Sequence, residues 1–101
     1  MQREYGFYVY ILSNTYHTVF YVGVTNNIQR RTWEHKNKQS RFTNKYNCHN
    51  LMYYEQYQYI NDAIRREKQL KKWHRAWKID LIKKGNPGMD DLAKDWFGST
   101  W

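Results

Sequence analysis

Two apolar runs near the start of the chain decide its fold: "FYVYIL" at residues 7–12 and "TVFYVGV" at residues 18–24. Both are short and rich in β-branched and aromatic residues, and the first ends at the turn-prone "SN". These features predict two β-strands. The polar segment between the runs suits an antiparallel hairpin.

Side chains alternate between the two faces of a strand, so the runs also predict which residues lie together. Tyr10 lies on the face opposite the Val and Ile side chains of the first run, and Tyr21 shares a face with Gly23 in the second. If the apolar sets face the same way, Tyr10 and Tyr21 point together to the other side. Gly23 would leave room there for a ligand or backbone. Alternatively, the tyrosines are half-buried packing residues and Gly23 marks a bulge.

A cationic helix is expected directly after the hairpin. Residues 25–27, "TNN", are good N-cap candidates, and "IQRRTWEHK" at 28–36 contains neither Gly nor Pro. Arg31 and His35 are four residues apart, so they share a helix face with Ile28. That face is either a solvated basic surface or a site for a negatively charged group.

The rest of the chain alternates between polar, strand-like and helical segments. Residues 37–50 are polar and basic and predict a loop, whereas "LMYYEQYQY" at 51–59 predicts a third strand. A helix is expected over 63–84, capped by Asn61 or Asp62 and either continuous or broken near 73–75. Residues 89–97 are expected to form a short helix that packs back through its aromatic side chains.

Glu67 stands in the middle of the apolar stripe of this long helix. A carboxylate there is costly unless it is paired or bound to a metal. A salt bridge to a nearby Arg, or a position at the edge of the stripe, are the structural alternatives.

Composition limits the class of protein. The 101 residues fit one domain, and 17 Lys and Arg against 9 Asp and Glu give a net charge of +8. This charge is typical of a polyanion binder, with nucleic acid the first candidate and an anionic membrane surface the second; a basic surface that only aids solubility is the alternative. The lone Cys48 excludes an internal disulfide. Without a membrane-length run or a signal-peptide core, the cytoplasm is the expected location.

The ordered motifs resemble those of the GIY-YIG nuclease family, in particular its small single-domain bacterial members. "YVY" at Tyr8–Tyr10 stands where the family has GIY, and "YVG" at Tyr21–Gly23 stands where it has YIG. The likeness continues through Arg31, His35, "RFTNKYNCHNLMYYE" and "AIRREKQLKKW" and covers about residues 5–92. Tyr8 replaces the first glycine of the family motif, which alters the pocket and leaves the chemistry untouched.

This resemblance implies an α+β fold, a three-stranded antiparallel sheet flanked by helices, with a catalytic domain over 1–85 and a tail over 86–101 that packs back in part. It implies one Mg²⁺ or Mn²⁺ ion held by Glu67. The residues that match active-site positions are Tyr10, Tyr21, Arg31 and His35. The expected substrate-binding residues are Gly23, Arg30, Lys45 and, as the candidate for a late family asparagine, Asn86.

Two functions remain open on these observations. The first is a metal-dependent endonuclease that acts on DNA with low sequence specificity or by recognising its structure. The second is a module that binds nucleic acid, for example structured RNA, without chemistry. Neither requires a membrane or an obligate protein partner.

Overall fold

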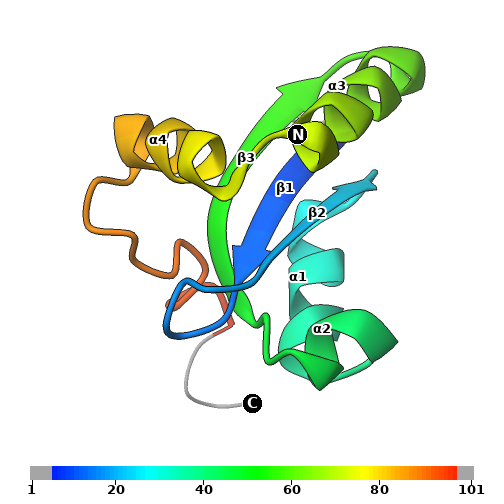
Figure 1. The fold of residues 1–101 in the computed structure, drawn as a ribbon. Coiled ribbons are helices and arrows are strands. Elements are labelled where there is room, and N and C mark those ends of the chain that lie inside the picture. Colours follow the sequence, from blue (N-terminus) through cyan, green and yellow to red (C-terminus); the bar gives the residue numbers. More distant parts are fainter. Residues whose placement is uncertain (1–5, 98–101) are drawn as a thin grey trace.

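A computed structural model describes residues 6–97 (Figure 1). The strands β1 (Phe7–Ser13), β2 (Phe20–Thr25) and β3 (Asn50–Tyr57) form one antiparallel sheet in the order β2-β1-β3. The expected hairpin and third strand are therefore confirmed, and β1 is the central strand. The fold is α+β, as predicted.

Helices cover both faces of this sheet. The two long helices of the second half, α3 (Ile60–Lys72) and α4 (Arg75–Gly85), lie on one face, whereas α1 (Ile28–Lys36) lies on the other, with the short α2 (Arg41–Lys45) after it (Figure 1). None of the helices within residues 6–97 combines the length and the apolar content that a membrane span requires.

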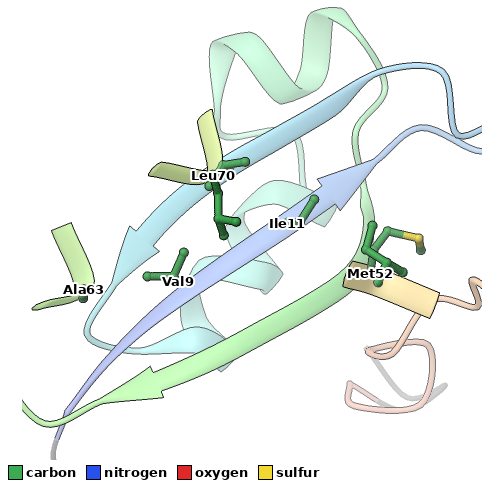
Figure 2. Packing of buried hydrophobic residues seen from close by; sticks show 7 residues of the cluster. Val9, Ile11, Met52, Ala63 and Leu70 are labelled. Carbon is green, nitrogen blue, oxygen red and sulfur yellow. The ribbon is translucent and has the colours of Figure 1, made fainter. Parts of the chain in front are cut away.

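The predicted alternation of side chains divides the core into two clusters. Val9, Ile11 and Met52 belong to one cluster with Ala63 and Leu70 of α3 (Figure 2). On the opposite face, the second cluster gathers side chains from β1, β3, α1 and the C-terminal tail. Its fully or largely buried members are Tyr10, Leu12, Ile28, Cys48, Leu51 and Ala93.

Strand register sets the partners of the tyrosine pair. Tyr10 lies opposite Gly23, and Tyr21 lies opposite Leu12. The irregularity of the sheet falls between Ile11 and Leu12, against β3. The bulge is therefore not at Gly23.

Several boundaries differ from the sequence prediction, and β3 ends at Tyr57 instead of residue 59. The polar segment expected to be a loop contains the five-residue helix α2, held in place by the buried Thr43. Helix α3 begins at Ile60, so Asn61 and Asp62 lie in its first turn and do not cap it. The break near Trp73 is confirmed, because α3 ends at Lys72 and α4 begins at Arg75.

The tail packs back onto the sheet without forming the expected helix. The carboxylate of Asp91 accepts a hydrogen bond from the backbone of Leu51 at 2.9 Å and pairs with Lys36 Nζ at 2.5 Å. Residues 92–96 are turns, and Trp96 and Phe97 pack against the second cluster as predicted. The last part of the predicted tail, residues 98–101, lies outside the described residues.

Candidate active site

The centre of the candidate site is the side chain of Tyr10, which is 1% exposed. Its ring lies directly across Gly23, where an added Cβ would stand only 2.5 Å from the phenol oxygen. The space that the sequence predicted beside Gly23 is therefore occupied by Tyr10 itself. Any larger residue at this position would displace the ring.

A line of hydrogen bonds runs from Tyr10 to α2. The Tyr10 hydroxyl lies 2.9 Å from His35 Nε2, and His35 Nδ1 lies 2.8 Å from Thr43 Oγ1. The Thr43 hydroxyl has one proton, which it donates over 3.4 Å to the carbonyl of Ser40. If the Thr43 proton is directed to Ser40, Thr43 Oγ1 accepts from Nδ1–H of His35, and this tautomer leaves Nε2 to accept from the Tyr10 hydroxyl.

Burial keeps both ring groups of this line uncharged at neutral pH. Desolvation and, to a smaller extent, the positive charge of Arg31 lower the pKa of His35 to about 4. Desolvation also raises the pKa of Tyr10 to about 12, and the hydrogen bond with Arg31 offsets this only in part. Burial therefore outweighs the stabilisation that Arg31 gives to the phenolate.

Arg31 lies beside Tyr10 with a carboxylate partner that the sequence argument missed. Its Nη1 donates to Glu34 Oε1 at 2.8 Å, and this hydrogen bond raises the pKa of Arg31. The side chains of Arg31 and Glu34 are 36% and 26% exposed. The i,i+3 spacing of the two residues on a helix was the signal that would have revealed the pair.

Aromatic rings pack beside the hydrogen-bonded residues Tyr10 and His35. The ring of Tyr21 lies 5.5 Å from that of His35, 6.3 Å from that of Tyr10 and 5.4 Å from that of Phe42. Phe42 belongs to α2, the helix that the sequence did not predict. The structure thus brings together Tyr10, Tyr21, Arg31 and His35, and it adds Thr43 and Phe42 to them.

Glu67 forms an ion pair within its own helix, α3. Its side chain is 15% exposed and pairs with Lys71 Nζ at 2.8 Å, and within residues 6–97 it makes no hydrogen bond to the tyrosine pair. The same residues contain no group of three His, Cys, Asp or Glu side chains that could hold a metal ion. A single carboxylate fits Mg²⁺ only where water and substrate phosphate supply the other ligands.

The remaining residues that the sequence predicts to bind substrate lie in different surroundings. Arg30 is 64% exposed on α1, and Lys45 is exposed on α2 with its ammonium 5.4 Å from the ring of Tyr46. Asn86 is only 7% exposed, and its amide nitrogen donates to the carbonyls of Met52 and Asp90. Asn86 thus ties the end of α4 to β3, and its predicted role in substrate binding stays a prediction.

The three-stranded antiparallel sheet flanked by helices is the fold that the resemblance implied, and comparison with known proteins identifies the same family. A model of the GIY-YIG catalytic domain matches residues 6–80, so the chain belongs to the GIY-YIG family. A "UPF0213 protein" of Syntrophus aciditrophicus (strain SB) is 37% identical over 82 residues, covering 79% of this chain and 92% of the relative. No solved structure shows a significant match.

Proposed function

We propose that this chain is a metal-dependent endonuclease that hydrolyses phosphodiester bonds in DNA, with low sequence specificity or by recognising DNA structure. The observation that carries the proposal is the continuous line of hydrogen bonds from Tyr10 through His35 to Thr43, with Arg31 beside it. Membership in a nuclease family and the net charge of +8 support a nucleic-acid substrate.

In this proposal, Tyr10 and His35 together accept the proton of the attacking water. Because the pKa of Tyr10 is raised to about 12, a preformed phenolate is scarce at neutral pH. The phenol oxygen instead takes the proton from water while its own proton moves to Nε2 of His35, which is neutral and free to accept it. Thr43 holds the imidazole in the tautomer that this transfer needs.

Arg31 is the proposed phosphate ligand. Its guanidinium can form two parallel hydrogen bonds with phosphate oxygens and so neutralise charge that develops there. A bound phosphate would compete with Glu34 for this guanidinium, because the two groups form an ion pair in the structure. Tyr21 lines the site, and Arg30 and Lys45 add exposed positive charge for the nucleic-acid backbone.

Glu67 is the proposed metal ligand for one Mg²⁺ or Mn²⁺ ion. A bound divalent ion stabilises the negative charge on a leaving oxygen. Glu67 is mostly buried and carries one partner, Lys71, whose side chain is half exposed and can move aside. A site with one carboxylate predicts weak metal affinity in the absence of nucleic acid.

One observation favours the alternative, a binding module without chemistry. Tyr10 is 1% exposed and its phenol is protonated at neutral pH, as expected of a tyrosine that serves packing. Structured RNA then replaces DNA as the partner. In both cases the cytoplasm stays the expected location, and we propose no obligate protein partner.

The test that separates the two functions is nicking of supercoiled and branched DNA, and of RNA, with Mn²⁺ and with EDTA. Tyr10→Phe keeps the ring and removes the hydroxyl, so it should lower the Mn²⁺-dependent rate by about 10²- to 10⁴-fold, the usual effect of losing a general base. Tyr8→Phe is the matched control on the same strand face and should change the rate little. Equal rates for Tyr10→Phe and wild type would favour the binding module.

A further inference from the structure

Residues at the junction of α3 and α4 line a groove. These two helices lie on the face of the sheet opposite α1 (Figure 1). The groove has a volume of about 490 Å³. We call it the tryptophan groove. Its lining residues are Arg65, Lys68, Gln69, Lys72, Trp73 and Trp77. The proposed cleavage site uses none of these residues, and its two tyrosines, Tyr10 and Tyr21, lie in the other cluster of the core.

Trp77 presents an open aromatic surface in this groove. Its side chain is 53% exposed, although an indole is among the most favourable groups to bury. Its neighbours Trp73 and His74 meet it nearly at right angles, at 87° and 79°, and neither stacks parallel to it. A flat group of a ligand therefore has indole surface to cover.

Trp73, which contacts Trp77, is anchored to the sheet through Arg66. Arg66 lies with its guanidinium carbon 5.2 Å from the ring centre of Trp73. Arg66 in turn donates to both carboxylate oxygens of Glu55 on β3, with Nε–Oε1 at 3.0 Å and Nη2–Oε2 at 2.9 Å. Burial alone would raise the pKa of Glu55, but hydrogen bonds from Arg66 and two tyrosines lower it, so the pair stays charged at neutral pH.

The charge of the groove is positive. Three of its six lining residues are cationic and none is acidic. Arg65 pairs with Asp62 at 3.2 Å, whereas Lys68 and Lys72 form no ion pair with any residue in the described range 6–97. Exposed ammonium groups beside an exposed indole suit a ligand that carries flat rings and phosphates on one chain.

We propose that the tryptophan groove binds single-stranded nucleic acid, with a base stacked on Trp77 and backbone phosphates at Lys68 and Lys72. A duplex keeps its bases stacked on one another and cannot offer a base face to the indole without unpairing. The groove would thus hold an unpaired strand, such as the arm or end of a structured substrate, while the paired part contacts the other face.

The proposal is tested by equilibrium binding in EDTA, so it does not depend on cleavage. Labelled single-stranded oligothymidylate of twelve residues and a twelve-base-pair duplex are the probes. Trp77→Ala should weaken binding of the single strand by about 5- to 150-fold, since stacking on one aromatic ring is typically worth this much. Binding of the duplex should change less than about 2-fold. Trp77→Phe keeps a ring and should retain most of the affinity.

The lysines provide a second test at exposed positions, where folding is not at risk. The double variant Lys68→Gln/Lys72→Gln should reduce the slope of log affinity against log salt by about 1.4 for the single strand, because each phosphate contact contributes about 0.7. Tyr16→Ala, an aromatic that is 83% exposed in the β1–β2 connection, is the control and should bind like wild type. Unchanged single-strand binding by Trp77→Ala and the lysine variant, or an equal loss for the duplex, would overturn the proposal.

Discussion

Thr43 is the residue whose contacts most change the chemical interpretation of the site. It is fully buried, and its oxygen lies 2.8 Å from Nδ1 of His35. A histidine nitrogen is a donor or an acceptor according to the tautomer, so a proton on Nδ1 that is donated to Thr43 leaves Nε2 to accept from Tyr10. Thr43 is therefore a positioning residue for the proposed proton transfer.

We expect Thr43→Val to lower kcat by about 10- to 100-fold, the usual effect of removing an outer partner that fixes a histidine. The substitution keeps the branched shape and leaves Nδ1–H of His35 without its acceptor. KM should change little, because Arg31 and the other cations are intact.

Thr43→Ser keeps the hydroxyl and is the matched control, with an expected recovery of most of the activity. Nitrogen chemical shifts of the His35 ring measure the tautomer directly in both variants. A valine variant with wild-type kcat and an unchanged tautomer would contradict this role.

At the level of the element, α3 carries residues of two proposed sites on different faces. Ala63 and Leu70 point to the core, Glu67 pairs with Lys71, and the cations of the tryptophan groove line its outer side. The ion pair between Glu67 and Lys71 follows from their i,i+4 spacing. It also means that a metal bound at Glu67 must compete with an ammonium group.

The proposed metal site makes opposite predictions for these two residues. Glu67→Gln should abolish Mn²⁺-dependent nicking while nucleic-acid binding in EDTA stays at the wild-type level. Lys71→Gln should lower the Mn²⁺ concentration for half-maximal activity by up to about 5-fold, which is the upper range for losing one exposed ion pair.

Lys94→Gln, an exposed change of the same charge in the tail, is the control for a general electrostatic effect. If Glu67→Gln still cleaved with wild-type metal dependence, the carboxylate would be structural.

The helix α2 shows why element prediction from sequence was incomplete. Its five residues are too few to display a helical period, and its composition is polar. The helix persists because buried Thr43 bonds to His35 and because Phe42 packs against Tyr21. Both are tertiary contacts. The strands, in contrast, were predictable, because strand geometry places successive side chains on alternate faces and this alternation is visible in the sequence.

On the scale of the whole molecule, the stability of the fold should depend on pH through His35. The pKa of its imidazole is about 4 in the folded chain and near 6.5 when unfolded. Between these values the unfolded chain binds more protons, so the free energy of unfolding falls as the pH is lowered from about 6.5 toward 4. The full effect is on the order of 3 kcal/mol.

Urea unfolding followed by tryptophan fluorescence at pH 7 and pH 5 measures this dependence. His35→Gln should show a clearly smaller loss between the two pH values than wild type. Burial also lowers the pKa of His49, so His49→Gln is the comparison and should remove a smaller part. The same loss in His35→Gln and wild type would show that the buried imidazole is not the responsible group.

The sequence alone determined the three strands, the face that Tyr10 and Tyr21 share, the nearness of Arg31 and His35 on one helix face, and the cationic character of the chain. These depend on backbone periodicity and on charge, which are local properties. It also predicted the site residues through their likeness to a family, because the order of the motifs survives without a structure.

Only the tertiary structure decided how these residues meet. Register placed Tyr10 opposite Gly23, and the ring fills the space that a side chain would need. The placement of α2 beside α1 brought Thr43 to His35, and the turn between α3 and α4 left Trp77 open beside a positive surface. The reason is that such contacts join side chains through the relative placement of whole elements. Periodicity within one element carries no information about that placement.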